Sequence, residues 1–88
     1  MMKEIHYSPK FKKQFKKYQT NPKFLERFVD CIDELKSGNL TPRRKNHKLQ
    51  GHFQAFWELH LFPDLLIVYE IRGDWVLFTQ IGSHSDLF

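Results

Sequence analysis

Three histidines of this chain lie where they could take part in acid–base chemistry. His47, His60 and His84, out of five histidines in 88 residues, each fall where a loop meets a strand-like stretch or follows one. Asp64 follows His60 across a short turn, and a carboxylate beside a histidine raises its pKa and fixes its tautomer. Since the unperturbed pKa of histidine is about 6.5, such a set can both remove and donate protons near neutral pH.

Cleavage of RNA through its own 2′-hydroxyl group is one reaction that this set could perform without a metal. It needs a base for the hydroxyl proton, an acid for the leaving 5′-oxygen, and positive charge near the phosphate. A metal site is less consistent with the sequence, which has no His-x-x-x-His pair, no pair of cysteines and no cluster of glutamates. We therefore expect no metal and no cofactor, and we expect His6 and His52 to be ordinary surface or hydrogen-bonding residues.

The positive charge of the chain is concentrated in its first half. Residues 1–48 contain thirteen of the fourteen Lys and Arg residues and five of the ten acidic residues, whereas residues 49–88 contain Arg72 and the other five acids. A basic half can attract RNA or DNA by counterion release, and it can equally attract an acidic protein. A solvated lysine-rich surface without a ligand is the alternative interpretation of the charge alone.

Size and composition indicate one compact domain covering residues 1–88. Nine Phe, three Tyr and two Trp residues supply apolar side chains for a single core. Cys31 is the only cysteine, so no disulfide can form within the chain, and the N-terminal residues lack the apolar run of a signal peptide. The apolar stretch 65–71 contains Glu70 and is far shorter than the roughly 20 residues that span a bilayer. We therefore expect a cytoplasmic protein without a membrane segment.

Hydrophobic spacing predicts a short strand at residues 3–7, followed by two helices. Ser8-Pro9 and Asn21-Pro22 are typical of helix starts, and Ser37-Gly38-Asn39 is typical of a helix end. The apolar positions at helical spacing are Phe11, Phe15 and Tyr18 in the first helix and Leu25, Phe28, Ile32 and Leu35 in the second. Cys31 lies beside the second stripe and is expected in the core.

The residue pattern of the rest of the chain predicts a basic loop, followed by three strands joined by tight turns. Residues 40–52 show no period, whereas residues 56–61, 65–71 and 75–81 are rich in aliphatic and aromatic side chains. Their short connections make them an antiparallel meander, with the wholly apolar segment 65–68 in the centre. The predicted fold is α+β in the order β-α-α-β-β-β, with two N-terminal helices packed on a small, mainly antiparallel sheet.

Strand alternation separates a core face from an accessible face in the segment 56–61. Trp57, Leu59 and Leu61 point one way, so an apolar core on that side leaves His60 on the opposite face. A site that contains His60 can therefore be reached from outside the core.

Three motifs occur in a fixed order in the second half of the chain. They are H-x-L-x-G, then H-x-x-P-D followed by an aliphatic strand, and finally G-S-H-S-x-L-F; the segments that carry them are HKLQGHFQAFWELHLFPDLLIVYEI and IGSHSDLF. In their order and spacing, these motifs resemble the YafQ branch of the RelE/ParE toxin superfamily. The first half of the chain agrees with that family in helix order and basic character.

The resemblance implies a RelE-like fold and the function of a toxin of a type II toxin–antitoxin system. Such a toxin is a ribosome-dependent endoribonuclease, an mRNA interferase that cleaves messenger RNA in the decoding site and thereby inhibits translation. The family's active-site residues correspond here to His47, His60, Asp64, His84 and the terminal Phe88.

The roles of these residues are interpreted as follows. His84 is the general acid, His60, oriented by Asp64, is the leading candidate for the base, and His47 helps to hold the phosphate. The sequence does not fix which of His47, His60, Asp64 and His84 is the acid and which is the base, because interacting groups titrate as a coupled set. The ring of Phe88 is expected to stack on an RNA base.

One position departs from the family pattern. Trp57 stands where relatives carry Arg, so a phosphate contact made by that Arg would have to come from elsewhere. The cations expected to supply it, and to bind RNA, are those of the basic loop: Arg43, Arg44, Lys45 and Lys48.

Two other functions are consistent with the fold or with the charge. A ParE-like toxin shares the fold but inhibits DNA gyrase without nuclease activity, and it needs no histidine set. A basic nucleic-acid-binding module without catalysis needs only the two-sided charge. The resemblance also implies a cognate antitoxin with an acidic, partly disordered segment, and a toxin–antitoxin complex that binds operator DNA.

Overall fold

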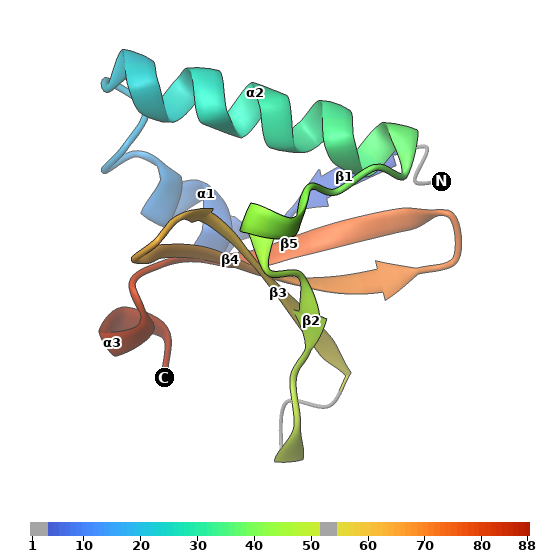
Figure 1. Cartoon of the computed structure of the whole chain (residues 1–88). Helices are drawn as coiled ribbons and strands as arrows, with labels where there is room; N and C mark the ends of the chain where they lie inside the picture. Colours follow the sequence, from blue (N-terminus) through green and yellow to red (C-terminus); the bar gives the residue numbers. More distant parts are fainter. Residues whose placement is uncertain (1–3, 52–54) are drawn as a thin grey trace.

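The structure, a computed structural model, describes residues 4–51 and 55–88 of the chain (Figure 1). In chain order its elements are β1 (Glu4–Tyr7), α1 (Pro9–Phe15), α2 (Pro22–Ser37), the 3₁₀ helix η1 (Pro42–Arg44), β2 (His47–Lys48), β3 (Phe56–Phe62), β4 (Leu65–Arg72), β5 (Trp75–Gly82) and α3 (His84–Leu87). The α+β class and the predicted order of one strand, two helices and three strands are confirmed. Three short elements were not predicted, namely η1 and β2 in the basic segment and α3 at the C-terminal end.

The five strands of the described residues form one mixed sheet in the order β1-β5-β4-β3-β2. β1 runs parallel to β5, and the other neighbouring pairs are antiparallel. β3, β4 and β5 make the predicted meander. β4 is the central strand, and its residues from Leu66 to Tyr69 are all buried, as expected for a strand that is covered on both faces.

Side-chain caps fix where the two N-terminal helices begin. The Ser8 hydroxyl accepts a hydrogen bond from the Phe11 N–H at 3.0 Å and donates one to the Thr79 carbonyl oxygen at 2.8 Å, which ties the start of α1 to β5. Asn21 caps α2 in the same manner, and a proline occupies the first turn of both helices. Gly38 ends α2 with a left-handed φ of 78°, a conformation that favours glycine.

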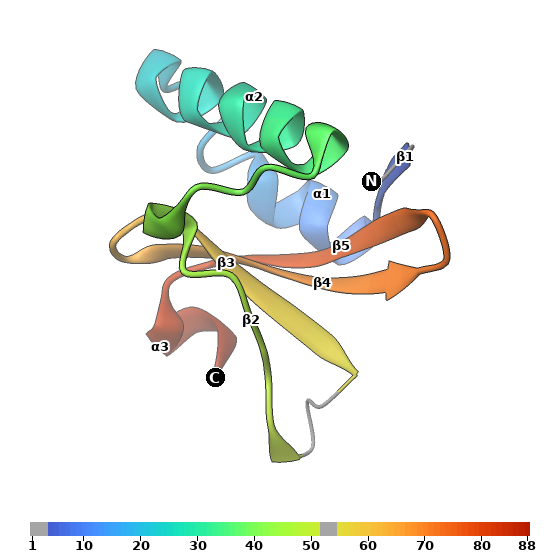
Figure 2. The same ribbon diagram turned by 45° about the vertical axis from the view of Figure 1, so that its right-hand side comes forward.

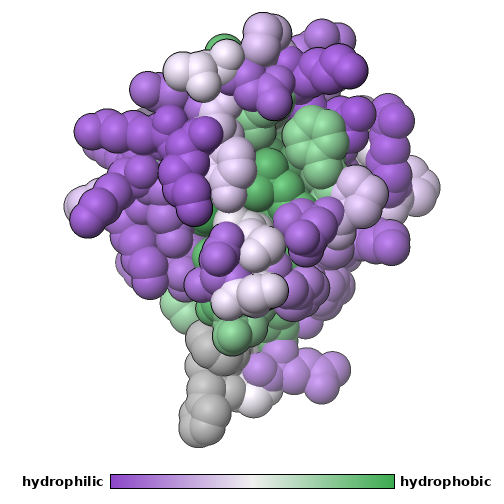
Figure 3. Space-filling model, turned by 90° about the vertical axis from the view of Figure 1, so that its left-hand side faces the viewer, coloured by the Kyte–Doolittle hydropathy of each residue, from purple (hydrophilic) through white to green (hydrophobic). Residues whose placement is uncertain are grey.

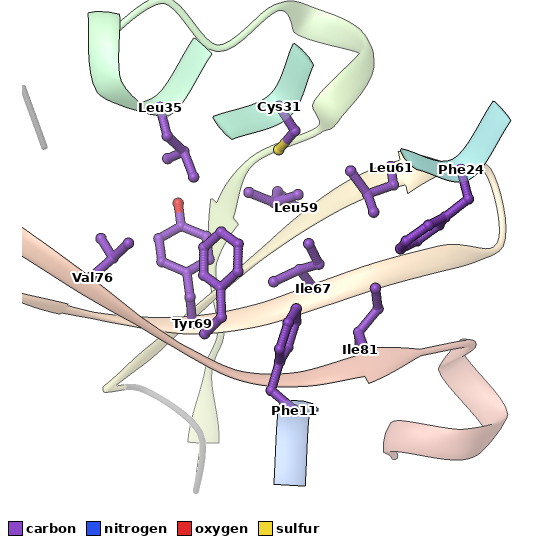
Figure 4. Packing of buried hydrophobic residues seen from close by; sticks show 11 residues of the cluster. Phe11, Phe24, Cys31, Leu35, Leu59, Leu61, Ile67, Tyr69, Val76 and Ile81 are labelled. Carbon is purple, nitrogen blue, oxygen red and sulfur yellow. The ribbon is translucent and has the colours of Figure 1, made fainter. Parts of the chain in front are cut away.

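The main core lies between the two helices and one face of the sheet. Figures 1 and 2 show α1 and α2 together on one side of the sheet and α3 on the other. Figure 4 shows side chains from both layers meeting in this core, which includes Phe11, Phe24, Cys31, Leu35, Leu59, Ile67, Tyr69 and Phe78. Burial of this apolar surface is the dominant favourable contribution to folding.

The buried stripe of α2 differs by one residue from the predicted one. Leu25 was expected in the core but is 38% exposed, whereas Phe24 is only 2% exposed and packs in its place. Cys31 is fully buried, as predicted. Because a helix repeats every 3.6 residues, position 24 and position 25 fit the later apolar positions almost equally well, and packing against α1 and β3 decides between them.

A second, smaller cluster covers part of the opposite face of the sheet. Leu66 and Val68 of β4 contact Leu87 of α3, and Leu49 and Phe56 pack against them. A helix of four residues is not stable on its own, so α3 depends on this contact and on its cap. The cap is a reciprocal pair in which Ser83 and Asp86 each bind the other's backbone N–H through their side chains.

The basic segment between α2 and β3 is tied to the rest of the fold. The Arg44 guanidinium of η1 donates from Nη2 to Glu34 Oε2 of α2 at 2.9 Å. The Tyr69 hydroxyl of β4 donates to Asn46 Oδ1. The sequence interpretation placed Arg44 on the surface with the other cations of the loop. This was wrong, because Arg44 is only 1% exposed.

Candidate active site

Glu58 is a buried carboxylate on the face of the sheet opposite the main core. It is 2% exposed, and it precedes His60 by two residues on β3, so both side chains share that face. Placing a charged carboxylate in a buried position is unfavourable unless hydrogen-bond donors or opposite charges surround it. The surroundings of Glu58 meet this requirement.

The rings of His47, His60 and His84 surround the Glu58 carboxylate. His60 Nε2 lies 3.2 Å from Oε1, within hydrogen-bond distance. His47 Nε2 lies 3.7 Å from the same oxygen, and His84 Nε2 lies 3.8 Å from Oε2. The structure thus brings together the three histidines that the sequence singled out, around a fourth residue that it did not.

These histidines come from three separate elements, which the tertiary fold brings together. β2 pairs with β3 so that His47 lies directly opposite Glu58, and β3 carries His60. The capped helix α3 carries His84 to the same face. Their exposure differs, because the side chains of His47 and His84 are 53% and 59% exposed, whereas that of His60 is 13% exposed.

The backbone of the basic segment determines the tautomer of His47. Its Nδ1 lies 2.8 Å from the carbonyl oxygen of Lys45, which can only accept a hydrogen bond, so Nδ1 carries a proton. In the neutral ring, Nε2 is then unprotonated and faces the carboxylate cluster. Lys45 presents this carbonyl from a left-handed backbone conformation, with φ 47°.

Phe88 lies beside the cluster through its contact with His84. The two ring centroids are 5.5 Å apart, and the Phe88 N–H donates to the His84 carbonyl oxygen at 2.9 Å. Phe88 is 49% exposed, which leaves much of its ring accessible to a ligand. Phe88 therefore lies close to one of the three histidines, and its predicted contact with RNA stays a prediction.

Asp64 is not the carboxylate that orients His60. It lies exposed in the β3–β4 turn, in a hollow that it lines together with Phe24, Phe62 and Leu65. Figure 3 shows the side of the molecule that is on the left in Figure 1, where a limited hydrophobic area is surrounded by hydrophilic side chains. Within residues 4–51 and 55–88, the His60 ring pairs with Glu58 and has no hydrogen bond or ion pair with Asp64. The pairing register of β3 with β4 shifts between His60 and Phe62, so the regular alternation of β3 does not continue into the turn that carries Asp64.

The exposed cations of the basic segment flank the histidine cluster. Arg43 and Lys45 line one cavity together with His60, and Lys48 follows His47 in β2. Arg44 is the exception, because its side chain is buried and paired with Glu34. Trp57 packs against the main core on the face opposite His60, as alternation predicted.

Two other histidines were expected to be unimportant for the site. His6 lies on β1, where its ring contacts Trp75 at a centroid distance of 4.5 Å, away from the cluster. His52 lies outside the described residues.

Within the part of the chain that the structure describes, no group of three or more His, Cys, Asp or Glu side chains is arranged to hold a metal ion.

Glu58 is the residue that the sequence interpretation did not assign. Alternation already placed it on the face of His60, two residues away, and that was the available signal. None of the described helices combines the length and the apolar composition that a membrane-spanning helix needs.

Comparisons with known proteins identify a family and several similar structures. The family described as "Bacterial toxin of type II toxin-antitoxin system, YafQ" matches residues 3–88. The chain is 26% identical over 90 residues to the protein named "mRNA interferase toxin YafQ" of Escherichia coli strain K12, an alignment that covers 100% of this chain and 98% of the relative.

Two solved structures illustrate the structural similarity. A metal-bound toxin from Helicobacter pylori is 37% identical, with a TM-score of 0.86, and the alignment covers 99% of this chain and 100% of that one. The YafQ chain of the E. coli DinJ–YafQ toxin–antitoxin complex is 26% identical, with a TM-score of 0.83, and the alignment covers 100% of this chain and 99% of that one.

Proposed function

The chain belongs to the YafQ family of bacterial type II toxin–antitoxin toxins, and from this premise we propose that it is an mRNA endoribonuclease whose active site is the histidine cluster around Glu58. The single observation that carries the proposal is the buried Glu58 carboxylate, faced by three imidazole nitrogens at 3.2–3.8 Å. A cluster of proton donors and acceptors on an accessible face is better explained by a role in proton transfer than by a role in stabilising the fold.

The proposed reaction is attack of an RNA 2′-hydroxyl on its neighbouring phosphate. The 2′-oxygen forms a bond to phosphorus while its proton passes to a base, and the bond from phosphorus to the leaving 5′-oxygen breaks as that oxygen takes a proton from an acid. Nearby cations stabilise the charge that develops on the phosphate.

The hydrogen bonds favour His47 over His60 as the base. Neutral His47 has its proton on Nδ1, bonded to the Lys45 carbonyl oxygen, so Nε2 is available to accept the hydroxyl proton. His60 Nε2 lies within hydrogen-bond distance of Glu58 and is a donor to that carboxylate. This differs from the sequence interpretation, which favoured His60.

His84 is the proposed general acid. Its side chain is 59% exposed, and Nε2 lies 3.8 Å from Glu58 Oε2, so the ring is accessible to a substrate and also lies close to the carboxylate. Phe88 lies beside it, at a position where its ring can stack on the base of a bound nucleotide. Glu58 then links the base, His60 and the acid through one charged group.

The family and the relatives also suggest the setting of the reaction. The named activity of E. coli YafQ is that of an mRNA interferase, and its complex with DinJ shows a toxin bound to its antitoxin. We propose that this chain likewise acts on messenger RNA at the ribosome, in the cytoplasm, and is neutralised by a cognate antitoxin. The comparisons favour this over the ParE-like inhibition of gyrase.

Induced expression in a bacterium tests the proposed function. Wild-type chain should arrest growth and create new transcript ends inside translated codons, and both effects should disappear in His47→Ala and His84→Ala. His6→Ala is the matched control, because His6 lies on β1 away from the cluster, and it should behave like wild type. Arrest with intact transcripts in all four strains would instead indicate a toxin that acts by binding.

A further inference from the structure

A cavity with a strongly basic lining lies next to the histidine cluster. Its volume is about 290 Å³, and it is enclosed by α2, η1 and the end of β3. Four of its eight lining residues are cations, namely Arg27, Arg43, Arg44 and Lys45, and none is acidic. His60 forms another part of the wall, so the cavity shares one residue with the proposed active site.

Arg27 is held in a fixed position at this cavity. Its Nη1 donates to the Leu61 carbonyl oxygen at 2.9 Å, and its guanidinium carbon lies 4.6 Å from the centre of the Phe62 ring. The hydrogen bond and the cation–π contact orient the planar group before any ligand arrives. A guanidinium that is already ordered loses little side-chain freedom when it binds an anion.

Arg44 adds buried positive charge with unused donors. Glu34 accepts a hydrogen bond from Nη2, but Nε and Nη1 are buried and have no hydrogen-bond partner among the described residues. Buried donors of this kind cost free energy unless an acceptor meets them. Because Arg44 also lines the cavity, an anion bound there would help to compensate its positive charge.

Lys45 connects this cavity to the catalytic cluster. Its side chain belongs to the cavity lining, while its carbonyl oxygen accepts the hydrogen bond from His47. The cavity therefore adjoins His60 directly and is linked to His47 through the backbone of Lys45. RNA presents phosphate groups at regular intervals along the strand, so a nucleotide cleaved at the histidines brings a neighbouring phosphate to this side.

We propose that the cavity is a phosphate subsite that binds a phosphodiester group flanking the scissile one. Arg27, Arg43 and Lys45 make the direct contacts, and Arg44 supplies charge from behind the wall. The inference rests on the proposed function, because it takes RNA as the ligand. The shared residue His60 and the link to His47 favour RNA over an acidic segment of an antitoxin.

The first experiment measures binding of a short RNA whose 2′-hydroxyls are methylated, so that cleavage cannot occur. Each phosphate that the protein neutralises on a single strand adds about 0.7 to the slope of log Kd against log salt concentration. Because Arg43→Gln removes one of the three direct contacts, its slope should be smaller than that of the wild type by up to this amount. Lys36→Gln removes one charge from the last turn of α2, outside the cavity, and should keep the wild-type slope.

Replacing single phosphates of that RNA by neutral methylphosphonates locates the contact. One flanking replacement should weaken binding to the wild type and weaken binding to Arg43→Gln less. The proposal would be overturned if the effects of the methylphosphonate and of Arg43→Gln on the binding free energy were additive at every flanking position. It would also be overturned if Arg43→Gln had the same slope of log Kd against log salt concentration as the wild type. If Arg43→Gln keeps the wild-type salt dependence of RNA binding but binds an acidic antitoxin peptide more weakly than the wild type does, the cavity is a binding site for the antitoxin instead.

A titration with inorganic phosphate provides an independent readout by NMR. The Nε–H signals of Arg27 and Arg44 should shift in the wild-type protein and shift less in Arg43→Gln. Signals that do not respond would count against an anion site. Both measurements are made without cleavage, so an inactive enzyme with a normal phosphate response would refute the proposed function alone.

Discussion

The carbonyl oxygen of Lys45 accepts a hydrogen bond from Nδ1 of His47 at a distance of 2.8 Å. Lys45 can present that oxygen because its backbone is left-handed, with φ 47°, at the end of η1. The tautomer of a side chain in the proposed active site is thus controlled by the backbone conformation of a residue two positions earlier.

Substitutions at Lys45 separate this backbone effect from the charge of its side chain. Asn adopts the left-handed region readily, whereas a β-branched residue does so at considerable strain. Lys45→Asn and Lys45→Val both remove the charge, so neither variant can bind phosphate through this side chain. We expect Lys45→Val to cleave RNA more slowly than Lys45→Asn, by up to about 10²-fold if the His47 ring is displaced by about 1 Å. Equal rates would mean that the backbone of Lys45 does not position His47.

Removing the charge of Glu58 should impair catalysis while the fold is kept. Glu58→Gln keeps the size of the side chain but removes the negative charge that faces the three histidines, and we expect the cleavage rate to fall by roughly 10²-fold. Glu70→Gln is the control, because Glu70 lies on the neighbouring strand and pairs with Arg72. A Glu58→Gln variant as active as this control would show that the carboxylate has no role in proton transfer.

The ion pair between Glu34 and Arg44 should make stability dependent on acid pH. Burial of Glu34 alone would raise its pKa, but hydrogen bonds from the Thr41 N–H and from Arg44 outweigh that effect and hold the pKa below its ordinary value. A group whose pKa is lower in the folded state stabilises the protein above its unfolded pKa, and this contribution disappears as the pH falls through the folded pKa.

Urea unfolding of wild type and Glu34→Gln at several pH values tests this linkage. At neutral pH the variant leaves Arg44 buried without its partner, and we expect a decrease of roughly 3–5 kcal/mol in the free energy of unfolding. The difference should shrink below about pH 4, where the unfolded glutamate is protonated. A difference that stays constant down to about pH 3, well below that unfolded pKa, would contradict the assigned role of the charge.

Cys31 should be chemically inert in the folded protein. It is fully buried, and burial raises the pKa of its thiol to about 12, despite the opposing effect of Arg44. Only the thiolate reacts, so iodoacetamide at about pH 8 should modify the native chain at least about 10³-fold more slowly than a free cysteine. In urea the ordinary rate should return. Rapid modification of the native chain would show that the core around α2 opens frequently.

The elements predicted from the sequence are those with strong local signals. Caps at Ser8 and Asn21, a left-handed glycine after α2 and turn residues between β3, β4 and β5 act over a few residues each, so their effect can be predicted without the fold. β2 and α3, with two and four residues, have no stability of their own. They form because Leu87 packs on β4 and because His47 pairs with the β3 backbone, and both interactions join distant parts of the chain.

The candidate site was predictable in its histidines but not in its carboxylate. The motifs identified His47, His60 and His84, whereas the choice between Asp64 and Glu58 as the partner of His60 depends on three-dimensional arrangement. Nearness in sequence across a turn favoured Asp64. The register shift at the end of β3 and the pairing of His47 opposite Glu58 reverse that choice, and neither has a local sequence signature.

The alternation of β3 means that the core and the proposed active site depend on the same strand register. Trp57, Leu59 and Leu61 face the helices, and Glu58 and His60 between them face the substrate side. Deleting one residue upstream within this strand would exchange the two sets, placing a carboxylate and an imidazole in the apolar layer and leucines at the catalytic surface. A misaligned chain would therefore lose the apolar core and the histidine–carboxylate cluster at the same time.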